Sequence, residues 1–348
     1  MYKKFVIIFF LFSESILMSN TILVTGGAGY IGSHTVLYLL KKGYQVIVLD
    51  DLSQGQEFNL SCNFIKGDFA DKNLLEQIFT QNKIDAVMHF AAFIEVGESV
   101  KDPLKFYINN VTKTLTLLEV MLKHKIKKFI FSSSCAVYGI PEFLPLTEDH
   151  PKNPVSPYGQ CKLMVENILK DFDTAYGLKF VSLRYFNAAG SINEHNLGER
   201  HSPETHIIPL IFKSIESGFA FKIFGADYST RDGSCIRDYL HVWDIASAHY
   251  KALEYLNANN NSDFFNLGTG TGYSVKEIIQ AVEILLDKKV ITLETDRRLG
   301  DPPILVADAT KAHKILDWQP LHSSLEEILK SAYNFFKLNF FTRPGHTE

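Results

Sequence analysis

Three side chains in the first half of the chain have the types and spacing needed for proton transfer. Tyr158 and Lys162 are four residues apart in the segment SPYGQCK, so on a helix they share one face. A phenol titrates near about pH 10, and neighbouring positive charge lowers that value. Tyr158 would then take a proton from a substrate hydroxyl. Ser134, at the end of the apolar run KKFIFSSS, would hydrogen-bond the same hydroxyl. Taken singly, these residues are equally compatible with a solvated helix face and a turn.

A glycine-rich corner near the start of the chain indicates a cofactor for this chemistry. The stretch ILVTGGAGYIGSH contains Gly26, Gly29 and Gly32 as G-x-x-G-x-x-G, overlapping G-x-G-x-x-G at residues 27–32. An apolar strand precedes it, a helical segment follows it, and Asp50 closes the next strand, which is the context that gives this pattern meaning. Such a corner lays a pyrophosphate against bare backbone and a helix N-terminus. A carboxylate at Asp50 accepts hydrogen bonds from a ribose diol and disfavours a 2′-phosphate, so NAD is expected rather than NADP.

The elements that must position these residues alternate between strands and helices. Strands are predicted over residues 22–24, 44–52, 63–69, 85–93, 127–139 and 179–190. Helices are predicted over residues 74–84, about 103–124 and 156–177, the last with Ser156 as its N-cap and Pro157 at its first position. This alternation predicts an α/β fold, a Rossmann-type doubly wound parallel sheet, followed by a smaller C-terminal α/β lobe that binds substrate.

Composition excludes several classes of function. The chain has 348 residues, of which 46% are hydrophobic and 21% charged, with a net charge of −4. It carries no basic stripe, so no nucleic-acid partner is expected. Four widely spaced cysteines, Cys62, Cys135, Cys161 and Cys235, are expected to be reduced thiols in a cytoplasmic protein, and no metal is expected. The apolar run Phe5–Phe12 is too short to span a bilayer, so no membrane partner is expected.

These motifs together resemble the extended short-chain dehydrogenase/reductases and, within them, the 4-epimerases of nucleotide sugars. The resemblance runs from about Ser19 to Phe336. It rests on the segments TGGAGYIGSH, IKGDFAD, HFAAFIEVGESV, PLKFYINNV, FSSSCAVYG, SPYGQCKLMVE, LRYFNAAG, FGADYSTRDGSCIRDYLHV, FNLGTGTGYSV and RRLGDPP. VGESV and DGSCIRDYLHV are specific to the 4-epimerases. The resemblance implies reversible epimerisation at C4 of UDP-glucose and UDP-galactose through a transient 4-keto sugar, with tightly bound NAD, by a homodimer.

The resemblance also implies a role for each site residue. The catalytic set is Ser134, Tyr158 and Lys162. The cofactor site comprises Gly26, Gly29, Tyr30, Ile31, Gly32, Asp50, Asp68, Phe90, Asn109, Tyr158, Lys162 and Tyr185. The substrate site comprises Ser134, Asn187, His206, Phe224, Arg237, Tyr239, Arg298, Asp301 and Leu305. Within it, Arg237 and Arg298 would clamp a diphosphate, Asp301 would accept from a hydroxyl, and Leu305 would border the sugar C2.

The same resemblance divides the chain into domains. Residues 18–187 would form the NAD-binding domain and residues 188–340 the nucleotide-sugar-binding lobe, with residues 341–348 as a frayed tail. Residues 1–17 are expected to be an N-terminal extension outside the fold, because Met18 stands directly before the first strand. A membrane-seeking leader is the alternative for this segment. A chain beginning at Met18 is expected to fold and keep full activity.

Other functions remain open at this stage. A UDP-N-acetylglucosamine 4-epimerase, or one of dual specificity, would use the same catalytic set. A nucleotide-sugar 4,6-dehydratase carries Asp-Glu just after the serine, where this chain has Cys135 and Ala136. Two departures from the family pattern are Ile94, where some members have lysine, and His206, where some have asparagine. A non-catalytic NAD-binding protein would not need the intact Ser134, Tyr158 and Lys162.

Overall fold

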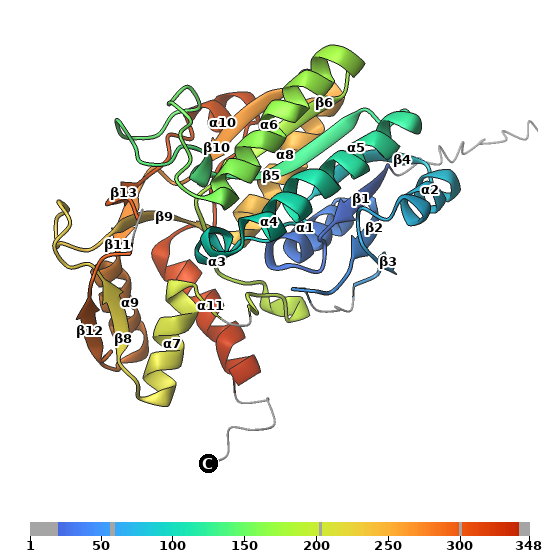
Figure 1. Ribbon diagram of the computed structural model, residues 1–348. Coiled ribbons are helices and arrows are strands. Elements are labelled where there is room, and N and C mark those ends of the chain that lie inside the picture. Colours follow the sequence, from blue (N-terminus) through green and yellow to red (C-terminus); the bar gives the residue numbers. More distant parts are fainter. Residues whose placement is uncertain (1–19, 56–59, 202–203, 299–300, 341–348) are drawn as a thin grey trace, which may run out of the picture.

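The computed structural model describes residues 20–55, 60–201, 204–298 and 301–340 (Figure 1). The extension expected at residues 1–17 and the tail expected at residues 341–348 lie outside the described residues. In the described part of the chain, no helix is both long and apolar enough to cross a membrane.

A seven-stranded parallel sheet organises the larger part of the molecule, in the order β10-β6-β5-β4-β1-β2-β3. Its strands are β1 (Thr21–Thr25), β2 (Gln45–Asp50), β3 (Asn63–Lys66), β4 (Ile84–His89), β5 (Lys128–Ser134), β6 (Lys179–Tyr185) and β10 (Asp263–Leu267). The strand order reverses between β1 and β4. In an open α/β sheet, the carboxyl ends of the strands at such a reversal form the ligand crevice. The predicted Rossmann-type fold is confirmed.

Helices cover both faces of this sheet (Figure 1). One face carries α1 (Tyr30–Lys41) and α8 (Val242–Asn259), and the other carries α2 (Lys72–Gln81), α5 (Lys113–Lys123) and α6 (Pro157–Tyr176). Successive residues of a strand point to opposite faces, so Val24 belongs to the core on the α1 side of the sheet, with Val36, while Leu23 belongs to the core on the α6 side, with Val165. Strands buried on both sides explain why the sequence shows continuous apolar runs there.

The helix predicted over about residues 103–124 is present but not uniform. After α3 (Val96–Lys101), the chain forms α4 (Pro103–Tyr107), a π-helical turn (Ile108–Thr112) and then α5. Pi-helical turns inside α-helices often occur at functional sites. Here the turn contains Asn109, which lines a small cavity beside Asp50.

The second lobe contains two small sheets. One joins β7 (Asn187–Ala189), β9 (Ile236–His241), β11 (Gly272–Ser274) and β13 (Ile304–Leu305), and the other pairs β8 (Phe221–Phe224) with β12 (Thr292–Thr295). The helices of this lobe are α7 (Ile207–Ser217), α9 (Val275–Leu286) and α11 (Leu325–Phe340), whereas α10 (Thr310–Ile315) packs beside β10 on the large sheet. Short 3₁₀ turns lie at Cys135–Val137 and Asn193–His195. A core that includes Ile211, Phe212, Val282 and Ile328 joins α7, α9 and α11.

The division of the chain differs from the contiguous lobe expected at residues 188–340. Helix α8 packs on the large sheet through Ile245 and Ala252, and β10 pairs with β6 as the last strand of that sheet. β10, rather than β6, is therefore the edge strand on this side of the sheet. The chain therefore returns to the nucleotide-binding unit before it completes the second lobe.

Candidate active site

The glycine-rich corner lies between β1 and α1, and its glycines meet a steric demand. Gly26 has φ +72°, and a Cβ there would lie 2.4 Å from the backbone nitrogen of Ala91. A Cβ at Gly32 would lie 2.2 Å from the carbonyl oxygen of Gly26. No side chain caps α1, whose N-cap residue is Gly29. The first N–H groups of α1 are therefore available to an anion, as a pyrophosphate requires.

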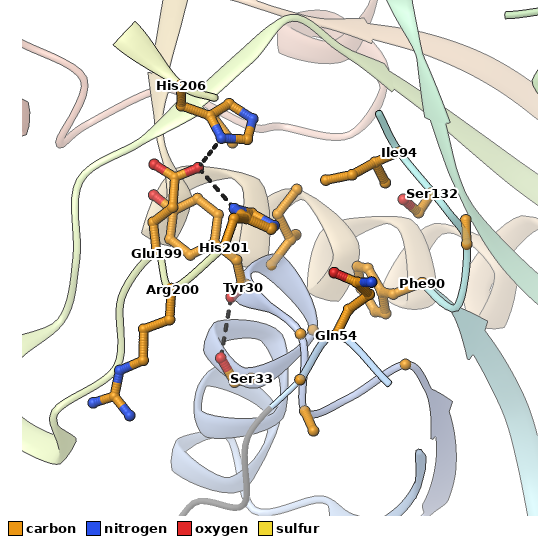
Figure 2. A pocket seen from close by; sticks show the side chains of 18 of the residues that line it. Tyr30, Ser33, Gln54, Phe90, Ile94, Ser132, Glu199, Arg200, His201 and His206 are labelled. Carbon is orange, nitrogen blue, oxygen red and sulfur yellow. Dashed lines mark hydrogen bonds and ion pairs between the residues drawn. The ribbon is translucent and has the colours of Figure 1, made fainter. Parts of the chain in front are cut away.

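A cavity of about 490 Å³ opens over this corner (Figure 2). Its lining joins two sets of residues that were predicted separately. From the cofactor set it includes Gly26, Gly29, Tyr30, Ile31, Gly32, Phe90 and Tyr185. From the catalytic set it includes all three members, Ser134, Tyr158 and Lys162. The glycine-rich corner and the side chains of Ser134, Tyr158 and Lys162 thus share one space.

Asp50 lies in a smaller adjoining cavity of about 90 Å³, together with Phe90 and Asn109. Its carboxylate accepts N–H groups of Ala28 at 2.9 Å and Leu52 at 2.8 Å. Burial raises the pKa of the Asp50 carboxyl, and these two backbone hydrogen bonds oppose the rise. Each oxygen keeps a second lone pair, so the carboxylate can still accept from a ribose hydroxyl.

Asp68 is placed differently from the rest of the predicted cofactor set. Its Oδ2 forms an ion pair with Nζ of Lys113 at 2.6 Å, and its Oδ1 accepts the N–H of Ala70 at 2.9 Å. The neighbouring residues Gly67 and Phe69 line the smaller cavity, whereas Asp68 is not among its lining residues. The structure therefore places this carboxylate beside the cofactor cavity rather than in its wall.

The catalytic set is fixed by two hydrogen bonds at the end of β5. Lys162 Nζ donates to the carbonyl oxygen of Ser132 at 2.7 Å, and Ser134 Oγ accepts the N–H of Ala136 at 3.2 Å. The Lys162 ammonium lies 5.7 Å from the ring centre of Tyr158. Burial lowers the pKa of Lys162 to about 8. The predicted helix face with Tyr158 and Lys162 is therefore present and turned toward Ser134.

The expected lowering of the Tyr158 pKa depends on Lys162 together with the positive charge of oxidised NAD. In the polypeptide by itself, burial raises the pKa of the phenol, and the hydrogen bond from Ser134 only partly opposes that rise. Lowering this pKa enough for base chemistry requires a further positive charge in the cavity.

A buried ion pair holds the catalytic helix against the sheet. Arg184 on β6 donates to both carboxylate oxygens of Glu166 on α6, at 2.9 and 2.7 Å, and both side chains are 1% exposed. Glu166 Oε1 also accepts the hydroxyls of Ser133 at 2.7 Å and Ser182 at 2.9 Å. Glu166 lies one turn after Lys162, and Ser133 directly precedes the catalytic serine. Sequence reasoning missed this network, although Glu166 continues the four-residue spacing of the tyrosine and lysine.

The predicted substrate set separates into two groups. Ser134, Asn187 and His206 line the large cavity. Six others lie in the second lobe around β9: Phe224, Arg237, Tyr239, Arg298, Asp301 and Leu305. Strand pairing connects the groups, because Asn187 is in register with Tyr239 and Leu305 with Arg237.

The second group shows internal pairing. The guanidinium of Arg237 is ion-paired with the carboxylate of Asp301, and the guanidinium of Arg298 lies 4.0 Å from the ring centre of Phe224. Leu305 packs against an apolar cluster that includes Tyr138. Arg237 and Asp301 thus bind each other, where the sequence predicted that each would contact substrate.

A cluster of four ionisable side chains lies at one wall of the cavity; Glu199, His201 and His206 line the cavity, and Glu204 lies behind them. Glu199 Oε1 lies 2.7 Å from Nδ1 of His206 and 3.3 Å from Nδ1 of His201, and the three side chains point toward one another (Figure 2). Glu204 Oε1 lies 3.0 Å from the same His206 nitrogen. Burial opposes protonation of His206, but the two carboxylates outweigh burial and raise the pKa of His206 to about 10. Sequence reasoning singled out only His206; the spacing E-x-H-x-x-E-x-H was the missed signal.

The fold and the site together define the class of protein: an extended short-chain dehydrogenase/reductase with an intact serine, tyrosine and lysine. Residues 22–268 match the NAD dependent epimerase/dehydratase family, and the chain belongs to that family. It is 50% identical over 318 residues to the UDP-glucose 4-epimerase of Halalkalibacterium halodurans, covering 91% of this chain and 95% of that one. It is 49% identical to the corresponding enzyme of Rhizobium meliloti, covering 92% and 98%. These findings confirm the resemblance seen in the motifs.

Solved structures agree with this assignment. The UDP-glucose 4-epimerase from Brucella ovis in complex with NAD matches with a TM-score of 0.88 and 43% identity, over 91% of this chain and 98% of that one. The UDP-Glc/GlcNAc 4-epimerase from Campylobacter jejuni matches with a TM-score of 0.79 and 42% identity, over 92% of this chain and 100% of that one. The protein is an NAD-dependent enzyme of the epimerase type.

Proposed function

We propose that the protein interconverts UDP-glucose and UDP-galactose by inverting C4 of the hexose. The observation that carries this proposal is the single cavity that joins the uncapped N-terminus of α1 to Ser134, Tyr158 and Lys162. A dinucleotide and a sugar hydroxyl can meet only where those two features share a space. The names of the relatives supply the substrate class.

NAD fits the residues present. A side chain at Gly26 or Gly32 would collide with nearby backbone, so the corner that the pyrophosphate approaches carries no side chain at these positions. Asp50 lines the adjoining cavity, where its carboxylate can accept hydrogen bonds from a ribose. Tyr185 and Phe90 line the space between these features and the catalytic set. When bound, NAD supplies a hydride acceptor and donor for C4 of the sugar, and a positive ring charge in the cavity.

The chain's own groups then move the proton. Tyr158 takes the proton of the 4-hydroxyl as general base while C4 gives up its hydride, which leaves a 4-keto sugar. After the sugar has turned and the hydride has returned to the other face of C4, Tyr158 gives the proton back to the 4-oxygen. Ser134 hydrogen-bonds the same oxygen. Lys162, held by the Ser132 carbonyl, keeps its ammonium on the tyrosine side of the cavity and stabilises the phenolate.

The nucleotide end of the substrate is assigned to the second lobe. Arg237 and Arg298 would bind the diphosphate with charge-assisted hydrogen bonds, and Arg237 would exchange the Asp301 carboxylate for phosphate oxygen. Asp301, released from that pair, would accept from a hydroxyl. Asn187, Phe224 and Tyr239 would complete the site. Because this lobe holds the nucleotide, the keto sugar can rotate without leaving.

The test is a conversion assay without added cofactor. Purified protein is incubated with UDP-galactose, and UDP-glucose is measured by chromatography. Conversion without added NAD supports the epimerase and a retained cofactor. Loss of water to a 4-keto-6-deoxy sugar would instead indicate a dehydratase. No turnover in the presence of 1:1 bound NAD would indicate a non-catalytic protein.

N-acetylated UDP-hexoses are a second substrate class that one observation favours. Leu305, the residue assigned to the space beside the sugar C2, is smaller than a tyrosine and is half-buried at the end of β13. We infer partial activity on UDP-N-acetylgalactosamine, below that on UDP-galactose. Including this substrate in the same assay measures the preference.

We also propose that the protein is a cytoplasmic homodimer. Its four cysteines are free thiols, as in a reducing compartment. Exposed apolar side chains gather on consecutive helical segments at Val96, Val100, Leu104, Ile108 and Leu115, with Met164 on α6. An exposed apolar patch of this kind commonly marks a protein–protein interface. Light scattering of the purified protein tests the dimer, and replacing Val100 and Leu104 by Ser should yield a monomer.

A further inference from the structure

We propose that Glu199, His201, Glu204 and His206 form a site for a divalent transition-metal ion of the Zn²⁺ type. Nothing in the proposed epimerisation requires such an ion. The four ligand atoms all lie within 4.8 Å of one another. They come from one short segment, with two ligands on each side of residues 202–203.

Two carboxylate oxygens and two imidazole nitrogens make a complete tetrahedral ligand set. Structural zinc sites in proteins have four protein ligands, drawn from cysteine, histidine and carboxylates. The separations are already short: Glu199 Oε1 is 3.3 Å from His201 Nδ1, and Glu204 Oε1 is 3.0 Å from His206 Nδ1. Ligands about 2 Å from a common ion would be separated by comparable distances. Small side-chain shifts would therefore suffice.

Burial and charge favour a cation at this place. The side chain of Glu199 is only 9% exposed, and those of His201 and Glu204 are 15% exposed. Among the described residues, Glu199 Oε1 and His201 Nδ1 have contacts at ion-pair distance but no hydrogen bond of normal geometry. A buried carboxylate without good hydrogen bonds is costly. A dication would neutralise both carboxylates and take the place of the proton that His206 Nδ1 otherwise holds between them.

The donor set selects the kind of ion. Mg²⁺ and Ca²⁺ prefer oxygen ligands, whereas imidazole nitrogen suits zinc and its first-row neighbours. A site with four protein ligands leaves no open position, which is typical of a structural role. We therefore assign the ion no step in the reaction.

The position of the cluster indicates what the ion would stabilise. Glu199, His201 and His206 line the large cavity, and α7 begins at Ile207, directly after His206. Binding would fasten this irregular wall to the first turn of α7. Through Nδ1, the ion would also set the ring orientation of His206 and leave Nε2 for other contacts.

Metal binding itself is the test, independent of catalysis. The protein as purified is analysed for metal by mass spectrometry, stripped with a chelator, and titrated with ZnCl₂, CoCl₂ and MgCl₂ with calorimetry. We expect one Zn²⁺ per chain, no Mg²⁺ binding, and an intense visible Co²⁺ spectrum of the tetrahedral type. His201→Asn and Glu204→Gln should each weaken Zn²⁺ binding by about 100-fold or more.

The control is a histidine–glutamate pair elsewhere on the surface. His322 Nδ1 lies 2.6 Å from Glu327 Oε1, with both side chains over 40% exposed. His322→Asn should retain one Zn²⁺ per chain with unchanged affinity. If the wild-type protein binds less than one tenth of a Zn²⁺ per chain after titration, the proposal is wrong. Equal zinc affinity of wild type, His201→Asn and Glu204→Gln would likewise overturn it.

Discussion

The two walls of the large cavity are built in different ways. The wall with Ser134, Tyr158 and Lys162 belongs to β5 and α6, which the buried Glu166–Arg184 ion pair fastens together. The opposite wall, around residues 195–201 and His206, is mostly irregular chain, in which Glu199 is ion-paired with His201 and His206. Groups that transfer protons need fixed geometry, which regular elements provide. Substitutions in the irregular wall, which would face the sugar, can instead change the shape of the pocket without moving the groups that transfer protons.

The largest loss of activity is expected when the phenol of Tyr158 is removed from the rigid wall. Tyr158→Phe should lower kcat for UDP-galactose by about 10²–10⁴-fold, since general-base catalysis contributes about that much. Bound NAD, measured by absorbance after denaturation, should remain. Tyr176→Phe, at the exposed end of the same helix, is the control and should have normal activity. A Tyr158→Phe variant within a factor of a few of wild type would show that the base is another group.

The second prediction concerns what makes that wall rigid. Glu166→Gln should lower the free energy of unfolding by about 3–5 kcal/mol, because it leaves the Arg184 charge buried and uncompensated. Chemical denaturation measures this. The folded variant should also show a lower kcat with little change in KM, because α6 loses the ion pair with Arg184 that holds it to β6. Glu326→Gln, which removes an exposed ion pair with Lys330, should change neither quantity. Unchanged kcat in folded Glu166→Gln would mean that the network does not position the catalytic set.

A third prediction tests the phosphate corner at the base of the same wall. Gly26→Ala should lose most of its bound NAD, because the new Cβ would meet the Ala91 backbone and the positive φ adds about 1–2 kcal/mol of strain. Gly43 also has a positive φ, +84°, but open space around it. Gly43→Ala should therefore be destabilised modestly and keep its NAD. Equal NAD content in the two variants would show that the close approach at Gly26 is not needed.

The smallest effect on UDP-galactose turnover is expected at Leu305, the residue assigned to substrate selectivity. Leu305→Tyr should abolish turnover of UDP-N-acetylgalactosamine and leave UDP-galactose nearly unaffected, while Leu305→Ser should raise the N-acetyl activity. A few methylenes in a pocket are worth about 1–3 kcal/mol of discrimination. The kcat/KM ratio of the two substrates in the three proteins decides. An unchanged ratio would remove Leu305 from the pocket.

Local rules made much of the site predictable. The steric demand at Gly26 and Gly32, the acid at Asp50 and the helical spacing of Tyr158 and Lys162 each follow from a few neighbouring residues. The pairing of β10 with β6 does not follow from neighbouring residues, because the two strands lie far apart in the chain. The ion pair of Arg237 with Asp301 is likewise a long-range contact.

Electrostatic environment was the least predictable property. Lys162 and oxidised NAD together are expected to lower the Tyr158 pKa, whereas in the polypeptide alone burial, which no local pattern reveals, raises it. The cluster of Glu199 with His201 and His206 was missed for a related reason. Its residues are near in sequence, yet only the folded chain turns them toward one another and away from water.

The fate of the hydrogen on C4 tests the central claim most directly. UDP-galactose carrying deuterium at C4 is converted to equilibrium in ordinary water, and the product UDP-glucose is examined by mass spectrometry and NMR. If hydride leaves and returns within one closed cavity while Tyr158 handles only the hydroxyl proton, deuterium stays at C4 of the product. Loss of deuterium to solvent would mean that C4 is deprotonated instead, and would contradict the account.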